Sequence, residues 1–130
     1  MKKLIFSLFI FGCLFFSSSL KAQYSINIDV KGNKDSILIL GYYYLDNTYA
    51  IDTAVNKKGK FSFEKKDKTL DPGIYFVSNT NGKYIEFIIE KEQKFSLSTL
   101  EEDWLNNMKV SKSKDNEIYY DYIRSTTKLS

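Results

Sequence analysis

The sequence predicts a mainly β fold, an antiparallel β-sandwich of about seven strands followed by one C-terminal helix. Short segments alternate between apolar and polar residues, turn-forming residues separate them at regular intervals, and the last part of the chain changes to helical spacing. In the segment 61–64, the two phenylalanines share one face while the serine and the glutamate share the other, as in a half-buried strand. Regular short strands followed by a helix favour a sandwich.

The turn signals define the strands. The segment 36–45 is almost continuously apolar, which predicts a central strand with a bulge or bend at Gly41. Asn56–Gly59 predicts a hairpin turn, because Gly59 tolerates the positive φ that such a turn requires. Asn81 and Gly82 predict a second hairpin. The predicted strands are 24–30, 36–45, 50–55, 61–64, 74–78, 84–89 and 94–100, with 108–110 as an optional short eighth.

The C-terminal segment, from Ser113 to Thr127, has the pattern of an amphipathic helix. A capping residue precedes four apolar residues on one face, Ile118, Tyr119, Tyr122 and Ile123. A helix of this length is marginal in isolation, so we expect it to dock weakly on the sandwich or to be covered by a protein partner or a second copy. The predicted organisation is a sandwich domain over 23–110 and a helical extension over 111–130.

The N-terminus has the features of a secretory signal peptide over residues 1–22. A basic start is followed by the apolar run Leu4–Phe16 and by small residues ending at Ala22, after which we expect cleavage. The run is shorter than the ~18 residues of a membrane-spanning helix. A retained anchor and a lipoprotein cleaved before Cys13 are the alternatives, but the bulky residue two positions before the cysteine disfavours lipidation. We expect a periplasmic or secreted protein that contacts the membrane only through its signal peptide.

The predicted mature chain has no net charge. The full sequence has 19 Lys+Arg and 16 Asp+Glu. Lys2, Lys3 and Lys21 belong to the predicted signal peptide, so 16 basic side chains remain against 16 acidic ones. Nucleic-acid binding depends on clustered basic side chains that neutralise phosphates, so we expect no nucleic-acid partner.

The predicted mature chain also lacks histidine and cysteine, because the sequence has no His and Cys13 is its only Cys. This excludes a disulfide, a thiolate nucleophile, an imidazole base and a zinc site built on thiolate or imidazole. We therefore expect no catalytic residue, no metal and no cofactor, and we expect that the protein is not an enzyme.

Clustered carboxylates are the remaining chemical groups. Glu101–Asp103 contains the oxygen ligands that calcium prefers, but the spacing of an EF-hand loop is absent and a solvated loop is the favoured interpretation. Pairs such as Asp46 with Asp52, or Glu86 with Glu90, have the residue types of a glycosidase. Acids scattered over a neutral domain are more typical of a charged surface.

The tyrosines suggest a surface for a ligand or a partner. The triplet Tyr42–Tyr44, with Tyr49 and Trp104, has the flat rings that stack on sugars or peptides, although core packing is the favoured interpretation of such residues. On a strand, the first and third members of the triplet face the same way. The candidate ligand or partner surface comprises Tyr42, Tyr44, Tyr49, Trp104, Ile118, Tyr119, Tyr122 and Ile123.

The order of several short motifs resembles a known family. Gly59–Phe63, Pro72–Tyr75, Phe87–Ile89 and a Ser113-x-x-Asn116 motif before a tyrosine-rich helix follow one another. This order is similar to the domain of unknown function at the N-terminus of envelope thioredoxin-like proteins of Gram-negative bacteria, in the thiol-disulfide oxidoreductase and peroxiredoxin-like group. The resemblance runs from about residue 24 to 122. The last motif usually reads Gly-Ser-x-x-Asn, and Lys112 stands here in the place of the glycine.

The resemblance implies an accessory role. Members of that family generally continue into a thioredoxin fold with a Cys-x-x-Cys motif, which this sequence lacks, so their redox activity is not carried over. What it implies is a non-catalytic periplasmic accessory domain that acts through protein contacts. The alternatives are a stand-alone module that binds a small ligand such as a glycan or peptide, and a truncated remnant of a longer redox protein.

Overall fold

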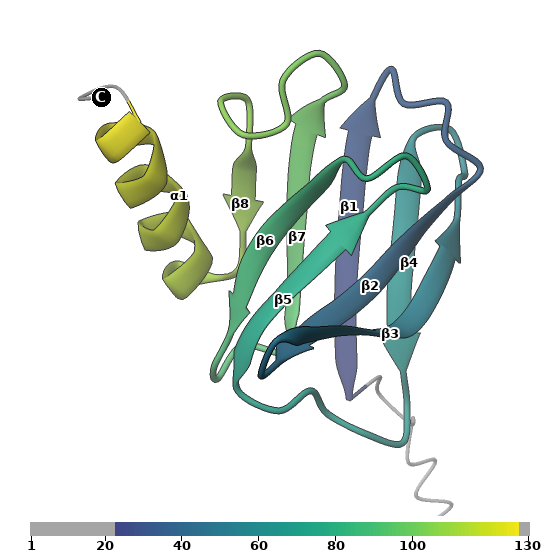
Figure 1. Ribbon diagram of the computed structural model, residues 1–130, viewed down its shortest axis with the longest axis vertical. Helices are drawn as coiled ribbons and strands as arrows, with labels where there is room; N and C mark the ends of the chain where they lie inside the picture. The colour runs from purple at the N-terminus through teal and green to yellow at the C-terminus, as the bar shows by residue number, and fades with distance from the viewer. Residues whose placement is uncertain (1–22, 128–130) are drawn as a thin grey trace, which may run out of the picture.

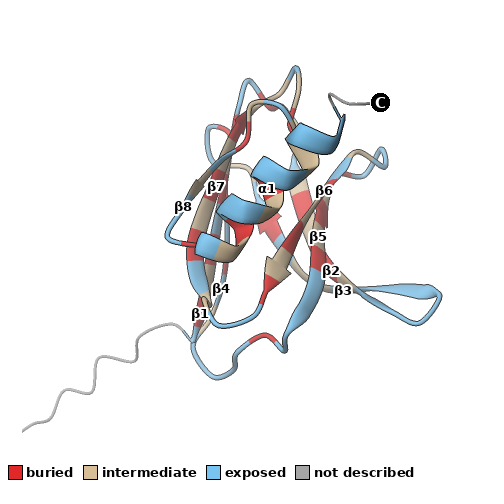
Figure 2. Ribbon diagram, turned by 90° about the vertical axis from the view of Figure 1, so that its left-hand side faces the viewer, coloured by how far each residue is buried: buried red, intermediate tan, exposed pale blue. Residues whose placement is uncertain are grey.

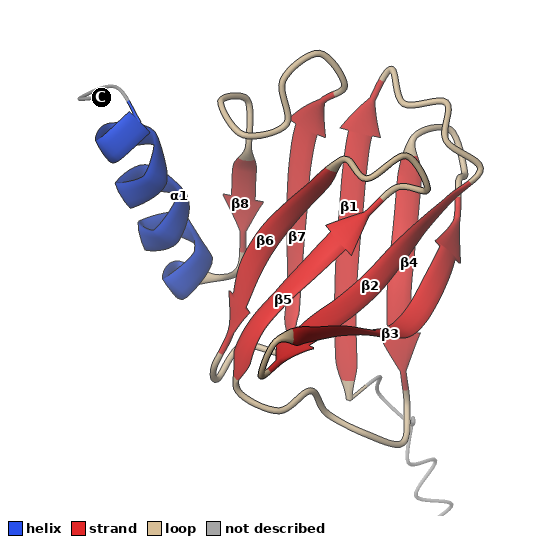
Figure 3. Ribbon diagram, in the orientation of Figure 1, coloured by secondary structure: helices blue, strands red, loops and turns tan. Residues whose placement is uncertain are grey.

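The computed structural model describes residues 23–127; the predicted signal peptide, with Cys13, and residues 128–130 lie outside this range. Two four-stranded sheets lie face to face, and one helix stands beside them (Figures 1 and 3). Sheet A has the order β4-β1-β7-β8, and sheet B has the order β3-β2-β5-β6. The elements are β1 (Tyr24–Lys31), β2 (Ile37–Tyr44), β3 (Asn47–Val55), β4 (Lys60–Lys65), β5 (Gly73–Ser78), β6 (Tyr84–Ile89), β7 (Lys94–Leu100), β8 (Lys109–Ser111) and α1 (Lys114–Thr127).

The fold class predicted from the sequence is confirmed. The core lies between the inner faces of the sheets, and the alternation in β4 places Phe61 and Phe63 in it at 1% and 0% exposure, while Ser62 and Glu64 are exposed. Every strand pair is antiparallel except one, because β1 and β7 run parallel. The short eighth strand is present as β8.

The predicted hairpin between β3 and β4 is wrong. β3 pairs with β2 in sheet B, whereas β4 pairs with β1 in sheet A, so the turn at Asn56–Gly59 carries the chain from one sheet to the other. The turn itself forms as expected, with a φ of +83° at Gly59 and the Gly59 amide donating to Asn56 Oδ1 at 2.6 Å. A turn motif specifies the local reversal of the chain but not the strand with which the next segment pairs.

The predicted irregularity at Gly41 is confirmed as a bulge between β2 and β3. The register shifts between Leu40 and Gly41, and Ile51 on β3 is left without a partner. A Cβ atom at position 41 would lie 2.4 Å from Cζ of Phe76, so the glycine makes room for that ring. Beyond the bulge, the β2–β3 hairpin projects from the body of the sandwich (Figure 2).

The start of α1 follows the Ser113-x-x-Asn116 motif. The amide of Asn116 donates to Ser113 Oγ at 3.3 Å, and the Asn116 side chain donates to the same oxygen at 2.9 Å. Ser113 is therefore the N-cap of the helix. The preceding residue, Lys112, has a φ of +66°, a left-handed conformation that glycine adopts without strain. This explains why glycine suits the position in the motif.

The helix docks mainly through residues other than the predicted apolar four, of which Tyr119 also packs against the core. Its buried residues are Asn116 and Tyr120. The Asn116 side chain donates to the Ile88 carbonyl at 2.8 Å and accepts from the Ile88 amide at 2.7 Å, as a neighbouring strand would. The Tyr120 hydroxyl donates to the carbonyl of Glu86. These bonds satisfy the backbone on the outer edge of β6, where unpaired groups would otherwise invite another strand.

Candidate functional site

The outer face of sheet A, called here the polar face, is covered by small polar and charged side chains. Cross-strand neighbours on it include Ser25 with Glu64, Asn27 with Ser62, and Ser98 with Lys109. Ser25 Oγ donates to Glu64 Oε1 at 3.0 Å, and Ser62 Oγ donates to Asn27 Oδ1 at the same distance. This face has the composition of a sheet surface that faces water.

The outer face of sheet B has the opposite composition. Its strands place isoleucines and aromatic rings on the side that points away from the core, and the register groups them together. Ile74 and Tyr84 are 50% and 55% exposed. Among the paired outward positions of β2, β3, β5 and β6, Glu86 is the only charged side chain. We call this surface the apolar face and define it by Ile37, Ile39, Tyr43, Ile74, Phe76, Tyr84 and Ile88.

Glu86 lies among tyrosines on this face. The Tyr43 hydroxyl donates to Glu86 Oε1 at 3.0 Å, and the Tyr43 ring packs against Phe76 at a centroid distance of 5.1 Å. Burial, followed by the hydrogen bond to Glu86 and its negative charge, raises the pKa of Tyr43 to about 12. Burial, the charge of Glu86 and a hydrogen bond to it also raise the pKa of Tyr119. The carboxylate is thus held by phenol groups.

The helix extends the apolar face beyond the edge of sheet B. Ile118, Tyr119 and Tyr122 border a shallow hollow of about 320 Å³ together with Ile88 and two acidic residues. Ile118 and Tyr122 are 57% and 67% exposed, and Tyr119 is half-buried. The predicted apolar stripe is therefore a largely outward surface. Its fourth member, Ile123, is half-buried.

The predicted tyrosines of β2 and β3 lie on the opposite side of sheet B. Tyr42 stacks on Tyr49 at 5.4 Å and is tilted against Tyr75 at 6.2 Å. Tyr75 in turn stacks on Phe87, so an aromatic ladder runs from the core to the projecting hairpin. Tyr44 continues this side and is 61% exposed, and a groove of about 400 Å³ lies between it and the loop before β5. Three of the predicted ligand-surface residues, Tyr42, Tyr44 and Tyr49, are thus brought together.

Trp104 does not belong to an exposed surface, which corrects the prediction for this residue. It is 3% exposed, and its indole N–H donates to Glu101 Oε2 at 3.0 Å. Lys83 Nζ lies 4.6 Å from the ring centroid. Burial acts to raise the pKa of Glu101, but hydrogen bonds from Asn33 and Trp104 and the charge of Lys83 outweigh it, and the pKa is lowered. A tryptophan with its N–H satisfied is stable in the interior.

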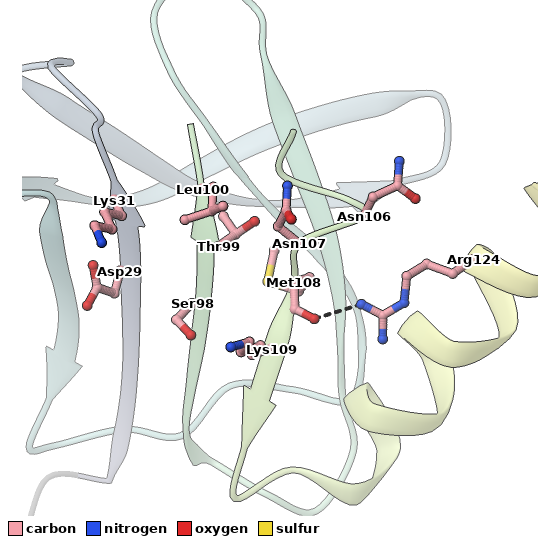
Figure 4. A pocket seen from close by; sticks show the side chains of 10 residues that line it. All are labelled: Asp29, Lys31, Ser98, Thr99, Leu100, Asn106, Asn107, Met108, Lys109 and Arg124. Carbon is pink, nitrogen blue, oxygen red and sulfur yellow. Dashed lines mark hydrogen bonds between the residues drawn. The ribbon is translucent and has the colours of Figure 1, made fainter. Parts of the chain in front are cut away.

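A polar hollow of about 520 Å³ lies over the polar face, between β1, β7, β8 and the end of the helix (Figure 4). Arg124 borders it, and its Nη1 donates to the Met108 carbonyl at 2.7 Å. Asp29, Lys31 and Lys109 lie on its floor and rim. The side chains that line this hollow carry charges of both signs, as is typical of a solvated surface. The hydrogen bond from Arg124 attaches the helix to Met108, the residue before β8.

Within residues 23–127, no group of three or more His, Cys, Asp or Glu side chains is arranged to hold a metal ion. No helix of the described chain is long and apolar enough to cross a membrane.

The residues that define the apolar face were not among the predicted site residues. Tyr43, Ile74, Phe76, Tyr84 and Glu86 become neighbours only through the register of β2, β5 and β6. The sequence signal for this face was that apolar residues occupy both the even-numbered and the odd-numbered positions of 37–44 and 84–89, so that the alternation there is weak. Strands that are apolar on both faces are typical of sheets covered on both sides.

The fold and its surfaces define a β-sandwich domain with one polar and one apolar outer face and a helix along one edge. The chain belongs to a family described as a domain of unknown function (DUF4369), whose model matches residues 24–119. The match covers all eight strands and reaches into α1. Comparisons with curated proteins and with solved structures found no significant match.

Proposed function

We propose that this domain is a non-catalytic accessory module of the cell envelope that acts through protein contacts, exported by its signal peptide to the periplasm or beyond. The observation that carries this proposal is the apolar face. The resemblance to the N-terminal domain of envelope thioredoxin-like proteins supports the same role, because an accessory domain works by contact with other protein surfaces. The absence of histidine and cysteine from residues 23–130 fits a role without catalysis.

The composition of sheet B supports a protein partner. A sheet with one solvated face alternates apolar and polar residues, whereas β2, β5 and β6 carry apolar side chains on both parities. Exposed side chains such as Ile74 and Tyr84 gather on one surface instead of being scattered. Contiguous exposed apolar surface marks sites of association. The helix adds Ile118 and Tyr122 to the same side.

A second candidate function is the binding of a small ligand, such as a glycan or peptide, at the aromatic ladder. The exposed rings of Tyr44 and Tyr49 and the adjacent groove of about 400 Å³ favour it. Pockets of this size and character accept small ligands. The rings of Tyr42, Tyr44 and Tyr49 lie on the opposite side of sheet B from the apolar face, although Tyr43 and Ile74 of that face also border the groove. A position on the apolar face outside the groove can therefore separate the two candidates.

Site-specific photo-crosslinking in envelope-containing cells tests the proposal. A photoreactive amino acid at position 84, which lies on the apolar face and outside the groove, should give a discrete adduct with a protein that mass spectrometry identifies as an envelope component. The same amino acid at the exposed position 62 on the polar face is the matched control and should give none. Adducts from position 62 alone, or none from position 84, would overturn the proposal. Adducts from position 44 and not from 84 would favour the aromatic ladder instead.

A further inference from the structure

We propose that the partner of the apolar face is a protein segment in which an arginine or lysine side chain, flanked by apolar residues, binds Glu86. This inference rests on the proposed function and specifies the chemistry of its partner. It follows from the charge of one residue in the middle of an otherwise uncharged surface. Glu86 is half-buried between Phe76 and the helix, yet no Lys or Arg of the described chain forms an ion pair with it.

Glu86 accepts a hydrogen bond from the Tyr43 hydroxyl at Oε1, and it lies close enough to Tyr119 to raise the pKa of that phenol. An ionised carboxylate has about four lone-pair sites. The bond from Tyr43 leaves acceptor capacity on the carboxylate and leaves its negative charge without a counter-charge.

A partner that covers this surface must also cover the carboxylate of Glu86. A purely apolar partner would remove the remaining water from Glu86 and would have to meet the cost of desolvating an unpaired charge. A partner that carries a cation at this point would replace that water with a charge-assisted hydrogen bond. The carboxylate therefore discriminates between partners, because it penalises apolar surfaces that lack a cation.

Aromatic rings surround the carboxylate of Glu86. The rings of Tyr43 and Phe76 lie against each other beside Glu86, and Tyr84 is near enough to raise the pKa of Tyr43. A guanidinium group can form two parallel bonds with a carboxylate, and it also stacks on aromatic rings. Cations are attracted to the faces of such rings. Arginine satisfies both requirements, and lysine satisfies the charge requirement.

The inference can be tested with two defined peptides and the full mature chain. Acetyl-Leu-Arg-Leu-amide carries the cation, and the same peptide with citrulline replaces it with a neutral group of nearly the same shape. Amide chemical shifts in nuclear magnetic resonance report where each peptide binds. We expect the arginine peptide to shift the amides around Glu86 and Tyr43 and to bind at least about tenfold more tightly than the citrulline peptide. Raising the ionic strength should reduce the difference in affinity between the two peptides.

Glu86→Gln is the decisive variant, because it keeps the shape and the acceptor oxygen and removes the charge. The preference for arginine should fall to about twofold or less in this variant. Glu64→Gln is the matched control on the polar face, where Ser25 donates to Glu64 at the same 3.0 Å that joins Tyr43 and Glu86. The control should leave the preference unchanged.

Several outcomes would overturn the inference. They are equal affinity for the two peptides, no shift that depends on Glu86, or shifts centred on the polar face. If the inference fails in this way while crosslinks from position 84 persist, the apolar face docks a protein without recognising a cation. If those crosslinks are also absent, the proposed function itself has failed.

Discussion

The two outer faces of this sandwich belong to two four-stranded sheets, yet one carries serines, lysines and acidic residues and the other isoleucines and tyrosines. β1 reads Tyr-Ser-Ile-Asn-Ile-Asp-Val-Lys, so every second residue is polar, whereas β2 reads Ile-Leu-Ile-Leu-Gly-Tyr-Tyr-Tyr. Inward positions are mostly apolar in both sheets, because both border the core. Outward positions differ in composition. Water suits the polar face, and the second protein surface that we propose as a partner would suit the apolar face.

The largest expected effect tests whether the polar face is as unimportant for stability as its composition indicates. Phe63→Ala removes a fully buried ring from β4 and should lower the free energy of unfolding by about 3–5 kcal/mol. Ser62→Ala, on the adjacent outward position, should change it by about 0.5 kcal/mol or less, since its hydrogen bond to Asn27 is exposed. Urea denaturation of the two variants provides the measurement. Similar denaturation midpoints would show that β4 does not separate a core side from a solvent side.

A smaller effect tests the edge along which the helix extends the apolar face. Asn116→Ala removes the amide that pairs with the Ile88 backbone and should cost about 2–4 kcal/mol, because two backbone groups lose their partner. Hydrogen exchange should show faster exchange throughout α1 and at Ile88. Asn81→Ala, in the exposed β5–β6 turn, is the matched control and should change stability by about 0.5 kcal/mol or less. If α1 keeps its protection in Asn116→Ala, other contacts hold the helix.

The strands were predictable because their signals are local. Alternation and turn residues placed β4, β6 and β7 within one residue of their observed bounds, and the apolar run 36–45 was correctly assigned to a central strand with a bulge at Gly41. Pairing is not local. The turn at Asn56–Gly59 has every feature of a hairpin, yet the phenylalanines that follow are buried by pairing with β1. Nothing in the turn specifies that choice.

The candidate site was predictable only in part, for a related physical reason. Counting apolar residues identified Ile118 and Tyr122, but the helix docks through Asn116 and Tyr120, whose polar atoms bond to a strand edge. A contact of this kind leaves no periodic pattern of apolar residues in the sequence. Trp104 has the residue type of a binding surface, and only its tertiary neighbours place it in the interior. Glu86 is similar, since its surroundings exist only after β2, β5 and β6 come together.

The smallest expected effect concerns Tyr43, because the pKa of its hydroxyl reports how far the apolar face already excludes water. Its pKa is raised to about 12 by burial and by Glu86, against about 10 for a tyrosine in an unfolded chain. A raised tyrosine pKa means that the folded state favours the neutral phenol. The stabilisation is therefore complete below about pH 10 and is lost as the pH rises through about 12.

Tyr43→Phe should cost about 1 kcal/mol or less near neutral pH, because it removes a single hydrogen bond on a partly exposed residue. Tyr44→Phe, on the other side of the same strand, is the matched control and should have no measurable effect on stability. The phenolate absorbance of the wild type minus that of Tyr43→Phe isolates one titration, which should be centred near pH 12. A centre near pH 10 would mean that Tyr43 is as well hydrated as a tyrosine in an unfolded chain. The apolar face would then be as solvated as the polar face, and the contrast between the two sheets would lie in composition alone.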